Sequence, residues 1–245
     1  DLKFLTQVEQ MYKDHQPTHV LHLAARVGGI VENIKYPYDY FEENILMNSN
    51  VIAMAKKYKV ERFVAMLTSC AYPDVVDTYP MKENDLFKGP PAKSNFSYAL
   101  TKRAMAAQID ACNIQYNTKY NYLMACNIYG EHDNFHDDDK MHFITALIKK
   151  IQDANKIDNG SINLFGTGAP LRQFMHAHDL ARILKEVVDR DITDSFKTSN
   201  SNRFAYRVGL QSWVFDPLSG YDFDDRLKDD GSFKVHQDVH FIGNA

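Results

Sequence analysis

The stretch THVLHL, residues 18–23, decides the fold class of this chain. It is a run of β-branched and apolar residues that leads into the turn-forming pair Gly28 and Gly29, which is the pattern of a strand that ends in a loop. Two similar runs follow, RFVAML at residues 62–67 and YNYLMA at residues 120–125. We therefore expect at least three strands of one sheet.

Helical patterns separate these strands. Residues 37–58 contain no glycine and no proline after Pro37, and their apolar positions recur at spacings of three and four. The further elements expected are helices at residues 2–13, 97–116, 141–155 and 177–190 and a short strand at residues 161–164. Because strands joined by helices of this length pair in parallel, the predicted fold is α/β, a doubly wound parallel sheet with helices on both faces.

The composition excludes several classes of protein. The chain has 245 residues, of which 44% are hydrophobic and 24% are charged, so it is not a disordered tail, a collagen or a coiled coil. Its net charge of −4 comes from interspersed residues, so we expect no nucleic-acid partner. No apolar run reaches the roughly 18 residues of a membrane-spanning helix, and no signal peptide opens the chain. Three scattered cysteines favour a reducing compartment, and we expect a cytoplasmic protein with no membrane partner.

Chemistry is expected at the carboxyl ends of the strands, where ligands bind in open parallel sheets. The helix at residues 97–116 places Tyr98 and Lys102 one turn apart on one face. An ammonium group beside a phenol favours the phenolate, which makes such a tyrosine a usable proton donor and acceptor. A chance surface pair explains this spacing equally well, since about one YxxxK is expected by chance in a chain of this composition. The hydroxyls of Thr68 and Ser69, which end the preceding strand, favour the functional interpretation.

Five blocks of sequence in a fixed order carry a resemblance to a known family. They are HLAARVGGIVENIKYP (residues 22–37), LTSCAYP (67–73), SNFSYALTK (94–102), NIYGEHDNFH (127–136) and GTGAPLRQFMHAHDLA (166–181). In these blocks the chain resembles the extended short-chain dehydrogenase/reductase family, and within it the enzymes that epimerise and then reduce GDP-4-keto-6-deoxymannose. The resemblance implies NADP as cofactor and a truncated Rossmann-like domain at residues 1–160. It also implies a substrate-side region with a divergent tail at residues 161–245.

The resemblance also implies how the chemistry is divided. Epimerisation beside a ketone needs a base on one face of the sugar and an acid on the other. By resemblance, Cys70 is the base and His142 is the acid. Tyr98 would polarise and then protonate the 4-keto oxygen, while Lys102 lowers the pKa of Tyr98 and orients the cofactor ribose. Thr68 stands where the family usually has serine and retains the hydroxyl. Without the resemblance, Cys70 is as well explained as a small buried thiol and His142 as a packing residue.

Further positions are implied to bind ligands. The resemblance places NADP against Ala24, Ala25, Lys102, Asn127 and Ile128, and the GDP-sugar substrate against Lys150 and Arg172. The five donors of an arginine suit a diphosphate. The pairs His132 with His136 and His176 with His178 have spacings that metal ligands can show. No third ligand accompanies either pair in the sequence, so we expect no metal.

The glycine-rich turn of the family is missing from this chain. That turn lies between the first strand and helix and binds the pyrophosphate of NADP, whereas the first glycine here is Gly28 in a later block. We therefore expect the first strands and the glycine-rich loop to be absent from this chain. Upstream residues or another chain could supply them. Alternatively, the protein is a non-catalytic relative that serves as a structural subunit of a larger assembly.

The family implies a homodimer built on a four-helix bundle if the protein is active. The helices at residues 37–58 and 97–116 are the candidates, although packing on the sheet explains their apolar stripes equally well. Another nucleotide-sugar epimerase or dehydratase is a further alternative, which Cys70 disfavours. For residues 194–245 we expect irregular structure with one or two strands.

Overall fold

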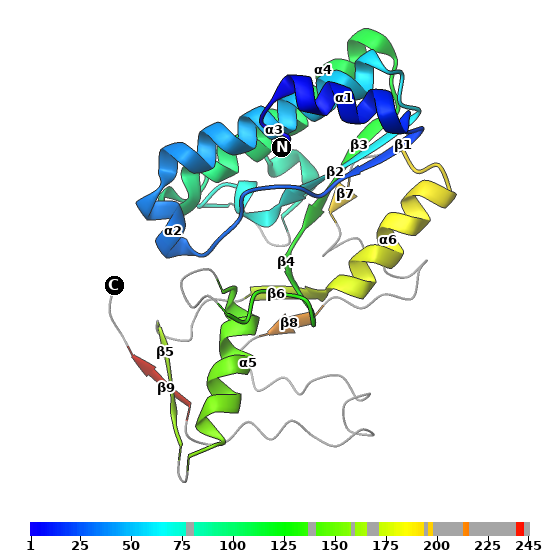
Figure 1. Cartoon of the computed structure of the whole chain (residues 1–245). Helices are drawn as coiled ribbons and strands as arrows, with labels where there is room; N and C mark the ends of the chain where they lie inside the picture. The colour runs from blue at the N-terminus through cyan, green and yellow to red at the C-terminus, as the bar shows by residue number, and fades with distance from the viewer. Residues whose placement is uncertain are drawn as a thin grey trace.

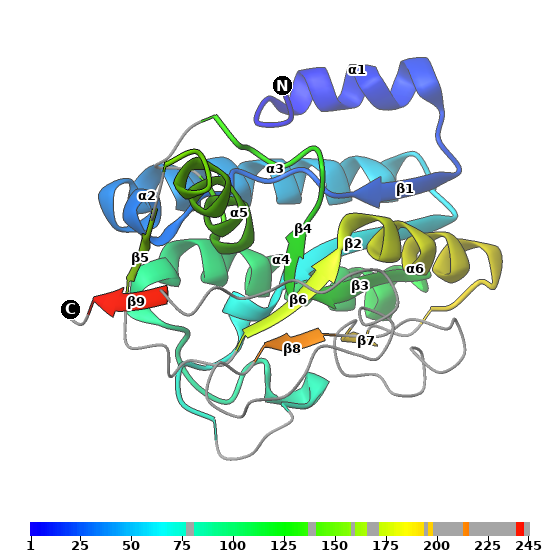
Figure 2. The ribbon, with the colours of Figure 1, turned by 90° about the horizontal axis from the view of Figure 1, so that it is seen from below.

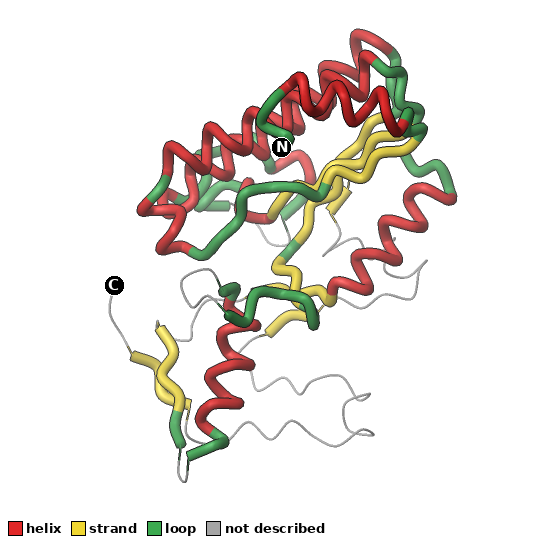
Figure 3. Tube along the Cα trace, viewed as in Figure 1, coloured by secondary structure: helices red, strands yellow, loops and turns green. Residues whose placement is uncertain are grey.

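The computed structural model describes residues 1–76, 81–136, 141–157, 160–165, 172–193, 196–197, 213–215 and 239–242. Figure 1 shows a parallel sheet with helices on both sides, and below it a smaller group of strands with one helix. The same division is visible when the trace is coloured by secondary structure (Figure 3). None of the helices in the described part of the chain combines the length and the apolar character that crossing a bilayer requires.

The main sheet has four parallel strands in the order β1, β2, β3, β7. Their bounds are β1 (His19–His22), β2 (Arg62–Thr68), β3 (Tyr120–Ala125) and β7 (Phe196–Lys197). Val20 is paired with Phe63, which is paired in turn with Tyr120. The predicted parallel sheet is confirmed, and the first three strands match their predicted bounds to within a residue at each end.

Three helices cover one face of this sheet, namely α1 (Leu5–His15), α3 (Pro37–Lys57) and α4 (Phe96–Tyr116). Pro37 suits the first turn of α3 because its φ is already helical. Beyond its last residue, α4 is capped by Asn117 in the left-handed conformation, with φ 52°. The apolar sides of these helices meet the sheet in a core that includes the buried Ile52, Phe63 and Ile109. The predicted helices therefore form because their apolar sides pack on the sheet, as the spacing of their apolar residues predicted.

The helix α6 (Ala177–Asp189) packs on the opposite face (Figures 1 and 2). Its Ile183 lies in a second core cluster with Val64 of β2. Leu21 of β1, whose register partner Val64 belongs to this second cluster, stays 44% exposed. Among the described residues, no strand pairs with the outer edge of β1.

Shorter elements complete the described structure. They are α2 (Ile30–Lys35), the 3-10 turns Ser69–Ala71, Glu83–Asp85 and Lys93–Asn95, β4 (Asn127–Tyr129), α5 (Phe143–Ala154), β5 (Ile162–Phe165), β6 (Arg172–His176), β8 (Trp213–Phe215) and β9 (Val239–Ile242). The strands β4, β6 and β8 form one small sheet, and β5 pairs with β9. The sequence did not reveal α2, β4 or β6, because elements this short are below the length at which periodicity is visible. The domain boundary after residue 160 stays a prediction.

Candidate active site

The end of β2 carries two of the predicted residues. Thr68 is the last residue of the strand, and its Oγ1 accepts a hydrogen bond of 3.3 Å from the backbone N–H of Cys70. This bond caps the 3-10 turn Ser69–Ala71, which carries Cys70 at its centre. The Cys70 thiol is exposed, whereas Ala71 directly after it is fully buried. The turn thus presents a thiol at the carboxyl edge of the sheet.

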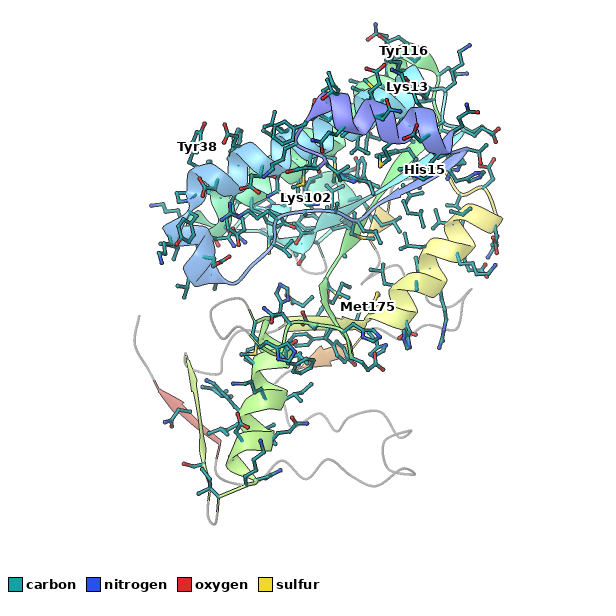
Figure 4. All side chains as sticks on the ribbon, viewed as in Figure 1. Lys13, His15, Tyr38, Lys102, Tyr116 and Met175 are labelled. Carbon is teal, nitrogen blue, oxygen red and sulfur yellow. The ribbon has the colours of Figure 1, made fainter. Side chains whose placement is uncertain are left out.

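The helix α4 brings Tyr98 and Lys102 to the same place. Lys102 is only 3% exposed, and its Nζ donates a hydrogen bond of 2.8 Å to the carbonyl oxygen of Met66 on β2. Its Nζ also lies 5.8 Å from the centroid of the Tyr98 ring. Figure 4 shows Lys102 inside the layered part of the molecule, whereas Tyr38 projects outward. Burial lowers the pKa of Lys102 to about 8.

The predicted lowering of the Tyr98 pKa by Lys102 is not what the structure shows. Burial raises the pKa of Tyr98 above its usual value of 10, and its neighbours Cys70 and Tyr40 raise it further. The reason is that an ionised phenol would lose its hydration in this partly buried position. The Tyr98 hydroxyl therefore keeps its proton at neutral pH and can donate a hydrogen bond.

A polar network that the sequence analysis missed holds the loop after β1. Asn44 of α3 accepts a hydrogen bond from the backbone N–H of Arg26 and donates one to the carbonyl oxygen of the same residue, both 3.0 Å long. The Arg26 guanidinium pairs with Glu43 at 2.6 Å and lies 4.9 Å from the ring centroid of Tyr40. Tyr40 packs edge-on against Tyr98, with 6.5 Å between centroids. The sequence feature that could have revealed this network is Asn44, a polar residue among the apolar positions of the predicted helix at residues 37–58.

The predicted cofactor positions lie at the carboxyl edge of the sheet. Ala24 and Ala25 follow β1 and have small side chains, with Ala24 exposed and Ala25 partly buried. Asn127 and Ile128 follow β3, and the Asn127 side chain donates a hydrogen bond of 2.9 Å to the carbonyl oxygen of Gln173. In open parallel sheets a dinucleotide binds at this edge.

The predicted acid lies on a different element. His142 immediately precedes α5 in the lower part of the molecule, and its side chain is 45% exposed. Its Nδ1 is 3.5 Å from Oδ1 of Asp133, whose other oxygen accepts a hydrogen bond from the buried Thr145. The structure thus brings Thr68, Cys70, Tyr98 and Lys102 together on β2, on the turn that follows it and on α4. It places His142 apart from that group, held by a carboxylate that the sequence analysis did not single out.

The predicted substrate residues are described only in part. Lys150 lies on α5, where its Nζ donates a hydrogen bond of 2.8 Å to the carbonyl oxygen of Asn163 on β5. Arg172 is the first residue of β6, and its side chain lies outside the described residues. Both assignments stay predictions.

A third group joins one of the histidine pairs, contrary to what the sequence suggested. Glu131, His176 and His178 place their potential ligand atoms within 4.8 Å of one another. However, His176 Nδ1 accepts a hydrogen bond of 3.2 Å from the backbone N–H of His178, so the neutral ring carries its proton on Nε2. Nε2 faces Glu131 at 3.5 Å. A metal-ligating histidine uses its second nitrogen as a donor instead, so the described geometry fits a cap on α6 better than a metal site.

Known proteins match this chain along most of its length. The family model for the NAD dependent epimerase/dehydratase family matches residues 1–197. A GDP-L-fucose synthase of Dictyostelium discoideum is 43% identical over 182 residues, which cover 74% of this chain and 56% of that protein. The chain therefore spans little more than half the length of this curated relative.

Solved structures match as well. A GDP-L-fucose synthetase from Naegleria fowleri bound to NADP has a TM-score of 0.68 and 31% identity, over 76% of this chain and 57% of that one. A GDP-D-glycero-L-gluco-heptose synthase from Campylobacter jejuni, in the presence of NADPH, has a TM-score of 0.69 and 27% identity, over 77% of this chain and 63% of that one.

Proposed function

Because this chain belongs to the NAD dependent epimerase/dehydratase family, we propose that it acts as an NADPH-dependent epimerase-reductase that converts GDP-4-keto-6-deoxymannose to GDP-L-fucose. The observation that carries the proposal is the exposed Cys70 thiol on the turn capped by Thr68, next to the protonated Tyr98. The relative named GDP-L-fucose synthase, at 43% identity, supports the choice of substrate.

Cys70 and His142 perform the epimerisation in this proposal. As a thiolate, Cys70 removes a proton from a carbon beside the ketone, and His142 in its protonated form delivers a proton to the opposite face of the same carbon. The resulting thiol and neutral imidazole exchange protons with solvent before the next step. The contact between His142 and Asp133 supports this role, because a carboxylate near Nδ1 holds the ring with Nε2 directed away. Two such exchanges, one on each side of the ketone, invert both carbons.

Tyr98 serves the reduction. Its hydroxyl donates a hydrogen bond to the 4-keto oxygen and gives up its proton to the alkoxide that forms there as the hydride arrives. The raised pKa supports the first part of this role, because it keeps the hydroxyl protonated at neutral pH. NADPH supplies the hydride to the same carbonyl carbon when it is bound. Lys102, whose pKa of about 8 keeps it mostly charged at neutral pH, would orient the ribose of NADP.

The ligands and the partner chain follow from the same proposal. Ala24, Ala25, Asn127, Ile128 and Lys102 would hold NADP, while Lys150 and Arg172 would hold the GDP group. We also propose a cytoplasmic homodimer formed by α3 and α4. Exposed apolar side chains on these helices support it, among them Tyr38 at 68% and Ile114 at 87%.

The direct test is turnover by the purified full-length protein. We expect NADPH oxidation that depends on GDP-4-keto-6-deoxymannose, with GDP-L-fucose identified by NMR as the product. A GDP-heptose 4-ketone should be tested beside it, because a heptose synthase is among the similar structures. Turnover would exclude the non-catalytic alternative, and a preference for the heptose would redirect the assignment within the family. Absence of turnover with both substrates would contradict the proposal.

A further inference from the structure

Two consecutive residues of α4 hold the segment that carries Cys70 from both sides. Lys102 Nζ donates to the carbonyl oxygen of Met66 at 2.8 Å, two residues before Thr68. Arg103 Nε donates to the carbonyl oxygen of Ala71 at 2.7 Å, one residue after Cys70. The turn between these two carbonyls is therefore tied to the helix that also carries Tyr98.

Arg103 occupies an unusual environment for a cation. The residue is 9% exposed, and its guanidinium carbon lies 5.9 Å from the Phe87 ring centroid. Burial lowers the pKa of the guanidinium. Among the described residues, no carboxylate forms an ion pair with it, and its Nη2 has no hydrogen-bond partner. Burying an unpaired charge is unfavourable, and an apolar side chain of similar size would stabilise α4 better. The hydrogen bond to Ala71 is a directional contact that an apolar side chain could not make.

Among the residues that the structure describes, none forms a hydrogen bond with the Cys70 sulfur. Cys70 is exposed, and its backbone is positioned by the 3.3 Å bond to Thr68 and by the closing bond of the turn, from Tyr72 N–H to the carbonyl oxygen of Ser69 at 3.1 Å. The Ala71 carbonyl lies inside this turn and belongs to a fully buried residue, so it needs a donor. Arg103 is that donor.

We propose that Arg103 is a positioning residue, which fixes the Cys70 turn through the carbonyl of Ala71 and so sets the place of the thiol relative to Tyr98. This rests on the proposed function, because it assigns Arg103 to the epimerisation step in which Cys70 is the base. The rate of proton abstraction falls steeply when the base is displaced, since the step depends on how closely the Cys70 sulfur approaches one carbon.

The test compares Arg103→Met, Arg103→Lys and wild type in the full-length protein, with Arg182→Met on the exposed face of α6 as the control. The first measurement is amide hydrogen exchange without substrate. In Arg103→Met, exchange in residues 69–72 should accelerate by about tenfold, the effect of one lost charged hydrogen bond. Exchange in β3 should stay unchanged. Arg103→Lys should restore most of the protection, because an ammonium can donate to the same carbonyl.

The second measurement is incorporation of deuterium from D₂O into the 4-keto sugar without NADPH, which reports epimerisation alone. It should fall roughly 10- to 100-fold in Arg103→Met, while hydride transfer, measured with an equilibrated substrate, falls much less. Three results for Arg103→Met would overturn the proposal. They are unchanged amide exchange in residues 69–72, an equal acceleration of amide exchange in β3, and an equal loss of rate in epimerisation and in hydride transfer. If the wild type proves inactive, the proposed function fails while the amide exchange still tests the contact.

Discussion

Replacing Lys102 with methionine should remove activity without destabilising the fold. Lys102 is 3% exposed, and burial lowers its pKa from 10.5 to about 8. The unfolded chain therefore holds this proton more tightly than the folded chain does. The difference between the two pKa values corresponds to roughly 3 kcal/mol by which the buried charge destabilises the fold at pH 7.

The opposing contribution is the hydrogen bond from Lys102 to Met66, which is worth about 1.5–3 kcal/mol for a charged donor. The two effects nearly cancel, or the penalty for the buried charge is the larger one. At pH 7 the unfolding free energy of Lys102→Met should therefore lie within about 1 kcal/mol of the wild-type value or above it. As pH rises from about 8 to 10.5, the wild-type lysine loses its charge in the folded state first. Wild type should therefore gain roughly 3 kcal/mol relative to the variant over this range.

The assay is urea unfolding of both proteins at several pH values, with Lys56→Met on the exposed side of α3 as the matched control. Tyr98 and the other buried tyrosines, whose pKa values are raised, destabilise both proteins alike above pH 10, so the difference between the two isolates Lys102. In parallel, the reduction rate of Lys102→Met should fall by about 100-fold or more. A variant that loses more than about 2 kcal/mol at pH 7, or a difference that does not change with pH, would refute this reasoning.

Further substitutions test the other parts of the site and the core. Cys70→Ser should slow deuterium incorporation into the 4-keto sugar more than it slows NADPH oxidation, whereas Tyr98→Phe should abolish reduction; equal losses in Cys70→Ser would contradict this division. Asp133→Asn should slow the incorporation of deuterium by about tenfold, because the His142 ring is less firmly held; unchanged incorporation would show that the contact is incidental. Phe63→Ala should lower the unfolding free energy by about 3–5 kcal/mol in urea titrations, since this ring is fully buried between the sheet and the helices. A loss below about 1 kcal/mol would mean that the core collapses around the cavity.

The fold was largely predictable because its elements are long and strongly patterned. The strands β1 to β3 and the helices α3 and α4 each carry a periodicity of two or three to four residues over most of their length. The strands β4 and β6 escaped prediction because they are three and five residues long and exist through pairing with each other. Pairing partners far apart in the chain leave no local signal.

The sequence by itself determined the strands, the helices, the family resemblance and those site contacts that are local. Thr68 with Cys70, and Tyr98 with Lys102, are neighbours by spacing alone, since one lies within a turn and the other within a helix. Only the tertiary structure decided what surrounds them. The contact of Arg103 with the Cys70 turn, the burial that raises the pKa of Tyr98 and lowers that of Lys102, and the orientation of that lysine toward β2 all arise where α4 packs on the sheet. These properties depend on desolvation and on groups more than thirty residues apart, which no spacing in the chain records.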